Sequence, residues 1–424
     1  MSLVSVLRRI PPIVEPNIYT KEDHGIDVNL IDIHALTIVE KLKKAGHEAY
    51  IVGGGVRDLL LGHKPKDYDI STSAKPEEIK SLFSNCILIG RRFRLAHIRY
   101  GRKVFEVATF RSGSNAEDEE LIVRDNDWGT AAEDMIRRDF TINGLCYDST
   151  DETVIDYVDG YPDIEKRLLR VIGKPFARFK QDPVRMLRML KFMARYGFEA
   201  DDEAMQALID CRSEIVKSSQ ARLFEELLRM LESGHSAQFF KLMTDKGMIQ
   251  ILLPVIGEYL EHPDGGTIYS FLQEVDTMIK EEEISHDRSL LLTCLLFPLL
   301  ERHLSVHYLE GGHIPHLGTI HGEAYTLIHD TFLPFFNVPR RIKGKMASIL
   351  VSQYRITPLT KRKMKKIRIP RIPDFDLAVY FARVRARLEP GLSEIIDPWE
   401  EALVDYIPPI KKRPPRRGGG RGRK

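Results

Sequence analysis

The 424-residue sequence predicts an α+β fold, in which a mixed α/β domain at the N-terminus precedes a long helical region. Two observations support this prediction. Up to about residue 160, short runs of strand character are separated by stretches with helical spacing. After residue 163, apolar residues recur at the 3.6-residue spacing of amphipathic helices. We therefore expect the chain to change from mixed to helical structure near residue 160.

Short strands and helices are expected to alternate in the N-terminal domain. Helices are predicted over residues 33–45 and 76–83. Residues 93–100 and 104–110 alternate between apolar and polar side chains, which predicts two paired strands. Residues 112–130 are rich in Asp, Glu, Asn and Gly, and we expect them to form a mobile loop near the functional site.

The expected domain boundaries follow from these changes of pattern. We predict an N-terminal extension over residues 1–27, an α/β head over residues 28–160 and a helical neck over residues 161–255. A helical body is expected over residues 256–406, followed by a disordered basic tail over residues 407–424. In the neck, amphipathic helices are predicted over residues 184–196, 203–209, 221–231 and 237–243.

Composition favours a soluble globular protein. Hydrophobic residues make up 43% of the chain, which is enough to bury more than one core. No apolar run reaches membrane-span length and the first 11 residues carry no signal-peptide pattern, so we expect a cytoplasmic protein without a membrane segment. The cysteines lie far apart without zinc-site spacing and are expected to be reduced core residues. They are Cys86, Cys146, Cys211 and Cys294.

A glycine-rich segment at residues 53–58, GGGVRD, predicts a phosphate-binding turn. Residues 49–53 have the character of a short buried strand, and the three glycines let backbone N–H groups approach a ligand closely. Residues 56–61 then predict the start of a helix, whose free N–H groups and positive dipole end suit the phosphates of a nucleoside triphosphate. The candidate nucleotide-binding residues here are Gly54, Gly55, Arg57 and Asp58.

Two aspartates follow the glycines at a spacing that predicts a metal site. Residues 67–70 have strand character, and side chains two apart in a strand point to the same face, so Asp67 and Asp69 aim at one spot. Such a pair commonly holds Mg²⁺, which takes few protein ligands besides phosphate oxygens and water, and Mn²⁺ would satisfy the same oxygens. Two ions about 4 Å apart would activate an attacking hydroxyl and stabilise the departing pyrophosphate. Glu106, in the strand-like run 104–110, is the candidate third catalytic carboxylate.

Two later motifs offer side chains for the sugar and the base of a nucleotide. Residues 137–143, RRDFTIN, hold polar groups that could reach the ribose and the phosphates. Asp182 and Arg185 lie three apart and are predicted on one face of a helix that Pro183 starts. A carboxylate acceptor and a guanidinium donor held there can pair with the edge of a base and select a nucleotide without a template.

An ordinary structural explanation exists for each motif alone. Glycine-rich turns and Asp-x-Asp pairs are common in loops, and residues 137–143 could be a capped helix start. Arg222 and Glu226, four residues apart, could form a helix-surface ion pair worth about 0.5 kcal/mol. Together, in this order and at this spacing, the motifs favour nucleotidyl transfer.

In this order the motifs resemble those of the class II nucleotidyltransferase family, which contains the tRNA CCA-adding enzymes and the bacterial poly(A) polymerases. The resemblance runs from about residue 30 to about residue 255, and such an ordered set of motifs is highly specific. It implies template-free extension of an RNA 3′ end from a nucleoside triphosphate. The head would then carry catalysis, and the neck would select the nucleotide and bind RNA.

The resemblance also implies roles for the later motifs. Asp139 and Asn143 would contact the sugar end of the nucleotide, and Asp182 with Arg185 would contact the incoming base. The nucleotide-binding residues that it implies beyond the glycine turn are Arg138, Asp139, Asn143, Asp182, Arg185 and Arg188.

Behind these residues, Arg222 and Glu226 would brace the nucleotide-selecting helix. This chain departs from the family at Gln181, where the family usually has Glu. The change removes a charge and adds hydrogen-bond donors. It leaves open whether this position orients Arg185 or admits both C and A.

Two segments favour the poly(A) polymerase branch of the family. Residues 87–98 resemble the segment that distinguishes bacterial poly(A) polymerases, although a surface hairpin with solvated arginines is the alternative, and residues 221–228 resemble the polymerase version of their motif. We therefore predict transfer of AMP from ATP to the 3′ ends of mRNA and other RNAs. The alternatives are a CCA-adding enzyme that uses CTP and ATP on tRNA, and an inactive RNA-binding module. The intact Asp67 and Asp69 argue against the module.

Positive charge is concentrated at the C-terminus. The formal net charge is +2, and residues 411–424 carry eight Lys or Arg without an acidic residue, which leaves −6 on the other 410 residues. This segment is predicted to be a disordered arm that contacts RNA phosphates, and a basic cluster at residues 361–368 could continue the path. A solubilising tail and a solvated helix face are the alternatives. The tail residues predicted to bind RNA are Lys411, Lys412, Arg413, Arg416, Arg417, Arg421, Arg423 and Lys424.

Overall fold

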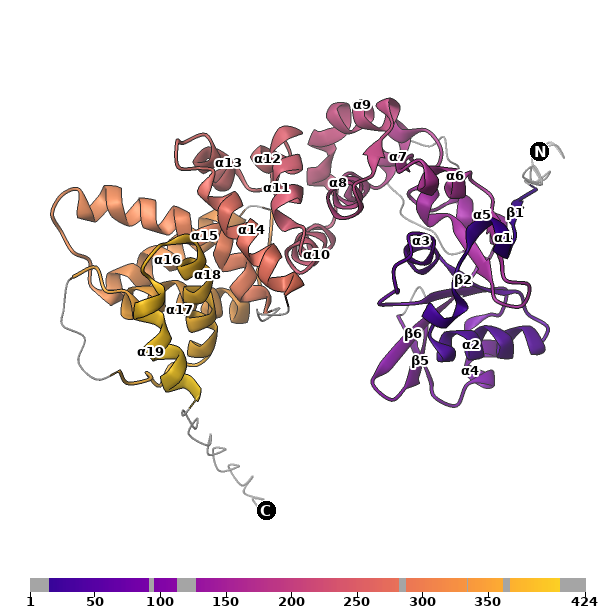
Figure 1. Cartoon of the computed structure of the whole chain (residues 1–424). Coiled ribbons are helices and arrows are strands. Elements are labelled where there is room, and N and C mark those ends of the chain that lie inside the picture. The colour runs from indigo at the N-terminus through magenta and orange to yellow at the C-terminus, as the bar shows by residue number, and fades with distance from the viewer. Residues whose placement is uncertain are drawn as a thin grey trace, which may run out of the picture. The chain divides into compact units, whose positions relative to one another are not determined.

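The computed structural model of the chain describes residues 15–90, 95–112, 127–281, 287–333, 335–360 and 367–404. It confirms the predicted α+β fold class, with a mixed sheet and its helices in the N-terminal part and mostly helices thereafter (Figure 1). The chain divides into two compact units. Unit 1 comprises Met1–Met230 and Gln238–Pro254, and unit 2 comprises Leu231–Ala237 and Val255–Lys424. The finer domain boundaries expected from the sequence remain predictions.

Unit 1 contains an 8-stranded mixed sheet with the order β1-β8-β7-β2-β3-β6-β5-β4. Neighbouring strands run antiparallel except β3 and β6, which are parallel. The predicted pairing of two strands is confirmed by β5 and β6, and the strand predicted over residues 67–70 begins only at Asp69. The strands are β1 Asn17–Tyr19, β2 Ala49–Val52, β3 Asp69–Thr72, β4 Cys86–Ile89, β5 Leu95–Tyr100, β6 Lys103–Thr109, β7 Leu145–Asp148 and β8 Thr153–Asp156.

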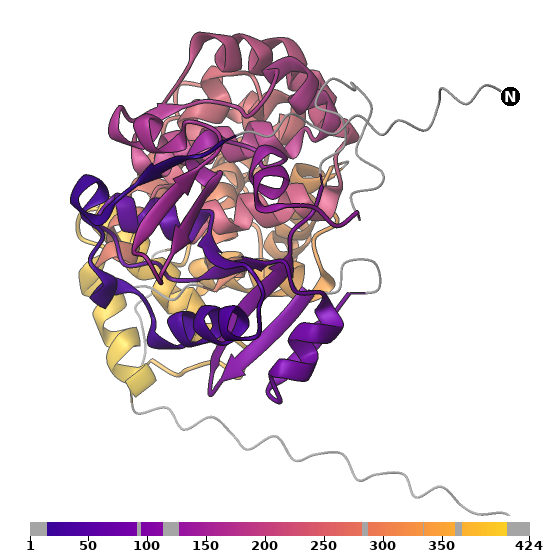
Figure 2. The same cartoon turned by 90° about the vertical axis from the view of Figure 1, so that its right-hand side faces the viewer.

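Two predicted helices, α2 (Ile33–Lys44) and α4 (Pro76–Leu82), form where local sequence signals start them. The Asp32 carboxylate accepts a hydrogen bond from the backbone N–H of His34 and caps α2, and a proline starts α4. Both helices pack side by side on one face of the sheet (Figure 2). The other helices of this part are α1 Lys21–His24, η1 Val28–Leu30, α3 Gly54–Leu60, α5 Ala131–Ile136, η2 Thr141–Asn143 and α6 Gly160–Glu165.

The predicted neck helices are also present. The helix predicted over residues 184–196 is α8, and the three that follow lie within α9, α10 and α11. A short parallel ladder pairs β9 (Leu168–Leu169), which precedes α7, with β10 (Glu199–Ala200), which follows α8. The helices are α7 Pro175–Gln181, α8 Val184–Tyr196, α9 Asp202–Cys211, η3 Arg212–Lys217, α10 Gln220–Leu231, α11 Ser236–Asp245, α12 Ile249–Leu252 and α13 Pro254–Leu260.

Unit 2 is helical throughout its described residues and is built around an apolar core. The rings of Phe271, Phe297 and Phe381 pack together, with centroids 5.2 to 5.8 Å apart. A second cluster forms around Phe375 and Trp399, whose ring centroids lie 5.6 Å apart. The helices are α14 Thr267–Lys280, α15 Arg288–Leu304, η4 Ser305–Leu309, α16 Leu317–Phe332, α17 Arg340–Ile356, α18 Phe375–Leu388 and α19 Ser393–Val404.

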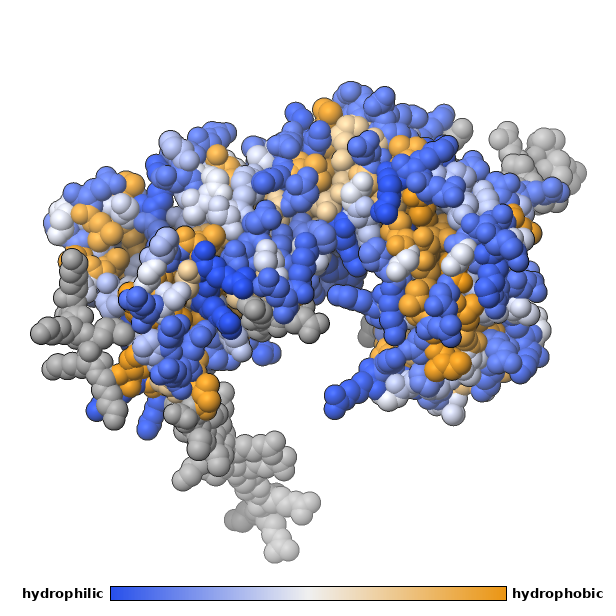
Figure 3. Space-filling model, viewed as in Figure 1, coloured by the Kyte–Doolittle hydropathy of each residue, from blue (hydrophilic) through white to orange (hydrophobic). Residues whose placement is uncertain are grey.

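One stretch of unit 2 differs from the expectation that no apolar run is long enough to span a membrane. By length and composition, the 22 residues Arg288–Leu309 are long and apolar enough to cross a membrane. However, 72% of the most apolar window in that stretch is buried inside the protein, as in the core helix of a globular unit. Hydrophilic residues cover much of the drawn face of each unit, and hydrophobic residues gather in a band over the sheet of unit 1 (Figure 3).

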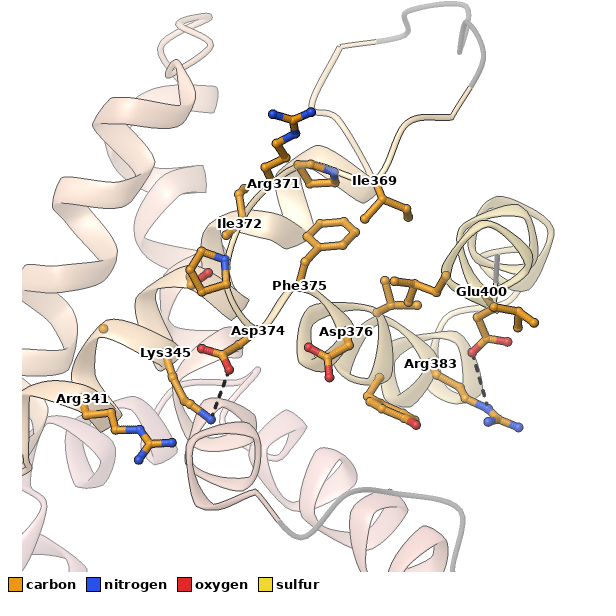
Figure 4. A pocket seen from close by; sticks show the side chains of 18 residues that line it. Arg341, Lys345, Ile369, Arg371, Ile372, Asp374, Phe375, Asp376, Arg383 and Glu400 are labelled. Atoms are coloured by element: carbon orange, nitrogen blue, oxygen red, sulfur yellow. Dashed lines mark ion pairs between the residues drawn. The ribbon is translucent and has the colours of Figure 1, made fainter. Parts of the chain in front are cut away.

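Unit 2 also contains a pocket of about 1260 Å³ beside α17, α18 and α19 (Figure 4). Its charged wall residues include two ion pairs, Lys345 with Asp374 at 3.4 Å and Arg383 with Glu400 at 3.8 Å. The residues described around it include none of the predicted catalytic or nucleotide-binding residues. All of those residues belong to unit 1.

Candidate active site

Three carboxylates lie near the middle of the sheet of unit 1. Asp69 is the first residue of β3, and the parallel register places it beside Glu106 on β6. Tyr68 is buried, and its hydroxyl donates to the carbonyl of Leu30 at 2.7 Å, so its neighbours in the chain point the other way. Asp67 and Asp69 are exposed there. The three predicted catalytic carboxylates are thereby brought together.

The pKa of Asp69 reflects this concentration of negative charge. Nearby protein partly removes water from its carboxylate and raises the pKa, and the charges of Glu106 and Asp67 raise it further. Arg138 and Arg188 act in the opposite direction. A bound divalent cation would relieve the repulsion, so the donor set fits Mg²⁺ or Mn²⁺. In the described part of the chain no three His, Cys, Asp or Glu side chains form a ready ligand set, but Mg²⁺ needs only one or two protein ligands.

Glu106 has a histidine neighbour that the motif analysis did not single out. The antiparallel register of β5 and β6 places His97 opposite Glu106, and Nε2 of His97 lies 3.4 Å from Oε1 of Glu106. This contact restrains one carboxylate oxygen. His97 belongs to the segment 87–98, whose resemblance favours the polymerase branch.

The glycine turn adjoins the carboxylates. Gly53 has φ +67° and ψ −127°, a conformation that residues with a side chain rarely adopt. A Cβ atom on Gly53 would lie 2.5 Å from Nη1 of Arg138, and one on Gly55 would lie 3.6 Å from the carbonyl oxygen of Asp67. The turn therefore requires glycine where Arg138 approaches it. Helix α3 begins at Gly54, earlier than predicted.

Arg138 keeps hydrogen-bonding capacity beside this turn. Its Nη1 donates to the carbonyl of Asn143 at 3.4 Å, and its Nη2 to the Asp134 carboxylate at 3.3 Å. Its buried Nε has no hydrogen-bond partner among the described residues. Because both contacts are long, the guanidinium can still bind a phosphate oxygen. The predicted nucleotide contact of Arg138 remains a prediction that this geometry favours.

Arg57 faces the interior of unit 1, contrary to the expectation that it points at phosphates. Its Nη1 donates to Oδ1 of Asn143 at 2.6 Å, while Nη2 and Nε donate to Oδ1 of Asp58 at 2.7 and 3.1 Å. Nη2 also donates to the Tyr196 hydroxyl at 2.8 Å. All three guanidinium nitrogens are therefore engaged, and Asp58 is engaged with them. Both residues brace the glycine turn from behind, and direct contact with a nucleotide stays a prediction.

Asp139 and Asn143, predicted near the sugar, form a buried pair. Asn143 Nδ2 donates to Oδ1 of Asp139 at 3.1 Å, and Arg188 Nε donates to Oδ2 at 2.6 Å. Burial alone would raise the pKa of Asp139, but Arg188, the Asn143 hydrogen bond and Arg185 together hold it well below its usual range. Asp139 in turn raises the pKa of Arg188. Through Arg188, this pair connects α8 to η2.

Asp182 and Arg185 are neighbours, but Asp182 is not on the predicted helix. Asp182 lies between α7 and α8, and its carboxylate oxygen is 4.0 Å from Nε of Arg185, which is buried in the first turn of α8. Arg222 on α10 donates from both terminal nitrogens to the two Asp182 oxygens, at 2.9 and 2.8 Å. A bidentate pair of this kind fixes the plane of the carboxylate.

The helix-surface ion pair that the spacing of Arg222 and Glu226 would allow is not among the contacts of the described residues. Arg222 binds Asp182 instead, and Glu226 accepts hydrogen bonds from Lys191 and, at 3.4 Å, from Arg188. Burial lowers the pKa of Lys191 to about 8, which its pairing with Glu226 partly opposes. The partners of Glu226 lie on α8, and the partner of Arg222 lies between α7 and α8.

Gln181 binds a buried arginine. Its Oε1 accepts a hydrogen bond from Nη1 of Arg178 at 3.0 Å, and Nη2 of Arg178 donates to the carbonyls of Arg137 and Arg138 at 2.6 and 2.7 Å. Arg178 on α7 thus binds the backbone at the start of the RRDFTIN motif. A neutral Gln suits this place, since it offers an acceptor to Arg178 without burying a second charge.

Several residues of the site escaped the motif analysis. Lys191 and Tyr196 follow Arg188 along α8, and Arg178 precedes Gln181 on α7. Their spacing gave a weak signal, because polar residues on an amphipathic helix are usually solvated. Only the folded arrangement shows that they are turned inward.

Some predictions fall outside the described residues. These are the tail cations at residues 411–424, most of the basic cluster at residues 361–368, most of the loop at residues 112–130, and residues 91–94 of the segment that favours the polymerase branch.

Family models match two parts of this chain. The model described as "Poly A polymerase head domain" matches residues 49–170. The model described as "Probable RNA and SrmB- binding site of polymerase A" matches residues 197–260. Together they cover strands β2 to β8, the predicted catalytic carboxylates and the helices α9 to α13.

Individual proteins show the same relationship. A poly(A) polymerase I of Escherichia coli O6:H1 is 36% identical over 412 residues, which are 92% of this chain and 86% of that protein. A CCA-adding enzyme of Lactobacillus johnsonii is 38% identical over 214 residues, covering 50% of this chain and 54% of that protein. The crystal structure of a Bacillus stearothermophilus CCA-adding enzyme in complex with CTP superposes with a TM-score of 0.61 at 22% identity, over 88% of this chain and 82% of that one. At that identity the last similarity concerns the fold alone.

Proposed function

Because the chain belongs to the class II nucleotidyltransferase family, we propose that it transfers AMP from ATP to RNA 3′ ends without a template, as a bacterial poly(A) polymerase. The coarser statement, that it is a nucleotidyltransferase acting on RNA 3′ ends, follows from the family. One observation supports the finer one. The similarity to the Escherichia coli poly(A) polymerase I extends over 92% of this chain, whereas that to the Lactobacillus johnsonii CCA-adding enzyme extends over 50%.

In the proposed reaction, the 3′ hydroxyl of the RNA attacks the α-phosphorus of ATP and pyrophosphate leaves. Asp67 and Asp69 would hold the divalent cation, Mg²⁺ or Mn²⁺, that supplies positive charge for the attacking and leaving oxygens. Glu106 lies beside Asp69 and adds to the negative field of this position. Arg138, next to the glycine turn, would bind phosphate oxygens. Positioning and charge thus account for the chemistry.

Base selection would rest on Arg185 in α8 and on Asp182, which lies just before this helix. The exposed edge of adenine offers an N–H donor beside a ring-nitrogen acceptor, which match a carboxylate acceptor and a guanidinium donor. Asp182 and Arg185 provide these two groups, and Arg222 fixes the Asp182 plane through two hydrogen bonds. Cytosine offers a similar pair of groups, so this geometry favours A and C over G and U. The choice of A over C rests on the similarity along the chain.

The test is an incorporation assay with each labelled nucleoside triphosphate. The protein is incubated with an unstructured RNA and, separately, with tRNA that lacks its terminal CCA. Long tails from ATP alone on the unstructured RNA are the expected result. Incorporation of C and then A that stops after the tRNA terminus is complete would instead identify a CCA-adding enzyme. RNA binding without any incorporation would favour an inactive module.

A further inference from the structure

Tyr196, the last residue of α8, makes an unusual contact with the glycine-turn helix. Its hydroxyl accepts a hydrogen bond from Nη2 of Arg57 at 2.8 Å and donates to Oδ1 of Asp58 at 3.0 Å. The guanidinium carbon of Arg57 also lies 4.5 Å from the centroid of the Tyr196 ring. One side chain of the neck thus binds two consecutive residues of α3.

The same Arg57 nitrogen lies close to the glycine turn. A Cβ atom on Gly54 would be 3.4 Å from Nη2 of Arg57, which is the atom that donates to the Tyr196 hydroxyl. Arg57 therefore lies against the backbone at the start of α3. Its guanidinium occupies the space beside Gly54.

At the other end of the same contact, α8 carries the residues predicted to select the base. Arg185 lies in its first turn, and Arg188 fixes a second point of the helix through Asp139. Two separated polar contacts, Arg188 with Asp139 and Tyr196 with Asp58, therefore hold α8 in addition to the packing of Phe192 on Phe140. Without the second contact, the last turn of α8 loses its hydrogen bonds to α3. The distance along α8 between Arg188 and Tyr196 is about 12 Å, at 1.5 Å per residue.

We propose that Tyr196 is a positioning residue, which sets the spacing between the glycine turn that takes the triphosphate and the helix that selects the base. The inference rests on the proposed nucleotidyl transfer, since the spacing matters only when one nucleotide occupies both places. Burial raises the pKa of Tyr196, so its hydroxyl stays protonated at neutral pH and can donate to Asp58. A misplacement of a reacting group by less than 1 Å is enough to slow catalysis severalfold.

The decisive variant is Tyr196→Phe, which keeps the ring over Arg57 and removes only the hydroxyl. A matched control is Tyr161→Phe, because the Tyr161 hydroxyl donates a hydrogen bond to the carbonyl of Asp23, at 2.7 Å, within the same unit. We expect kcat/KM for the incorporated nucleotide to fall about tenfold in Tyr196→Phe, mostly through kcat, and to change less than about twofold in the control. RNA affinity should be equal in both variants. Equal kinetics in the two variants would overturn the proposal.

A double variant separates positioning from general weakening of the fold. If Tyr196 acts through Asp58, the combination of Asp58→Ala with Tyr196→Phe should be no slower than Asp58→Ala alone, because alanine offers the Tyr196 hydroxyl no acceptor. If the two losses multiply, the residues act independently and the proposal is wrong. Thermal unfolding of each variant shows how much of any loss comes from stability, because a merely structural role lowers Tm without changing the kcat of the folded molecules.

The outcome for Tyr196 can be distinguished from the outcome for the proposed function. Kinetics are measured with whichever triphosphate the wild-type protein incorporates best, so a CCA-adding activity would change the proposed reaction and leave the comparison intact. If the wild-type protein incorporates no nucleotide, the proposed function fails. In that case the inference about Tyr196 is tested by the increase in Tm on addition of ATP. We expect a smaller increase for Tyr196→Phe than for Tyr161→Phe, and equal increases would overturn the inference.

Discussion

Both units bury arginine side chains, but the neighbours of those arginines differ. In unit 1, Arg57 joins α3 to α8 and to η2, and Arg188 joins α8 to the carboxylate of Asp139, just before η2. In unit 2, Arg385 on α18 binds Glu389 on the same side of its helix, and its guanidinium lies 4.5 Å from the ring of Phe297. The first two connect segments that carry predicted site residues, whereas the third also binds Gln353 and Thr357 at α17 and so joins helices that carry none of those residues.

Buried arginines therefore have different roles in the two units. A buried charge is costly unless hydrogen bonds and opposite charges compensate for it. In unit 1 the compensating groups belong to the turn, to η2 and to α8, so the bonds that stabilise the arginines also set the geometry of the site. In unit 2 the compensating groups belong to packed helices. Substitutions of these buried arginines in unit 1 should therefore reduce activity beyond their effect on stability, and substitution of Arg385 in unit 2 should not.

The largest effect is expected for Asp67→Ala. Loss of this carboxylate removes a predicted cation ligand next to the glycine turn, and transfer should fall by roughly a thousandfold or more. RNA affinity, measured by titration of a labelled RNA, should remain nearly that of the wild type, because Asp67 is not expected to bind the RNA backbone. The control is Asp151→Ala, an exposed aspartate of the same unit. Activity that survives in Asp67→Ala would refute the catalytic assignment.

A smaller loss is expected for Arg222→Gln. Arg222 holds both oxygens of Asp182, and without it this carboxylate can rotate away from the base. Because the Arg222 side chain is 57% exposed, the loss of this bidentate pair corresponds to about 1 kcal/mol. We therefore expect kcat/KM for ATP to fall about fivefold and the preference for ATP over CTP to change. Arg229→Gln on the same helix is the control, since Arg229 is exposed and pairs only with Glu225 in the described contacts. Equal discrimination in both variants would contradict the role of Arg222.

The comparison between the units is tested directly by Arg188→Met and Arg385→Met. Both changes remove a guanidinium from a buried or partly buried cluster, and each should lower the free energy of unfolding by about 2 to 3 kcal/mol, measured in urea. Arg188→Met should also lower the kcat of the folded protein, because Asp139 and Glu226 then lose a shared partner. Arg385→Met should leave that kcat unchanged. A loss of kcat in both variants would show that the two clusters are not functionally distinct.

Local pattern was enough to predict much of the fold. The fold class and the helices α2, α4 and α8 follow from amphipathic spacing and from start signals such as Asp32, which act over a few residues. Strand order is different, because pairing joins segments far apart in the sequence. The parallel register that places Asp69 beside Glu106 is of this kind, and the sequence supplied Glu106 only as a candidate.

The sequence motifs predicted which residues lie together at the candidate site, but not which side chains those residues bind. Arg222 and Glu226 have the spacing of a helix-surface pair, yet Arg222 binds Asp182, 40 residues away in the chain. Arg57 follows glycines that suggest phosphate, yet its Nη1 binds Asn143, 86 residues away. Local spacing is a weak guide for such side chains, because the energy of one surface pair is small beside that of a buried network. Tyr196 and Lys191 were missed for the same reason.

The smallest expected effect is on the pH dependence of stability, and it has opposite signs in the two units. The pKa of Asp139 in unit 1 is held below its ordinary value of 3.8. This carboxylate therefore contributes stability that is present above pH 3.8 and is lost as the pH falls through its lower folded pKa. Asp276 in unit 2 accepts hydrogen bonds from Ser236 and Ala237, yet burial raises its pKa above 3.8. Its contribution is fully present below pH 3.8 and is lost as the pH rises through its folded pKa.

Urea unfolding of Asp139→Asn and Asp276→Asn at about pH 3 and about pH 7 tests these signs. The destabilisation by Asp139→Asn should be larger near pH 7, because the wild-type carboxylate is then ionised and paired with Arg188. The destabilisation by Asp276→Asn should be larger near pH 3, because only the wild-type protein loses stability as its buried carboxylate ionises. If both variants are destabilised more near pH 7, the hydrogen bonds from Ser236 and Ala237 compensate the ionised Asp276 as fully as Arg188 compensates Asp139. The contrast between the two units would then not extend to their buried carboxylates.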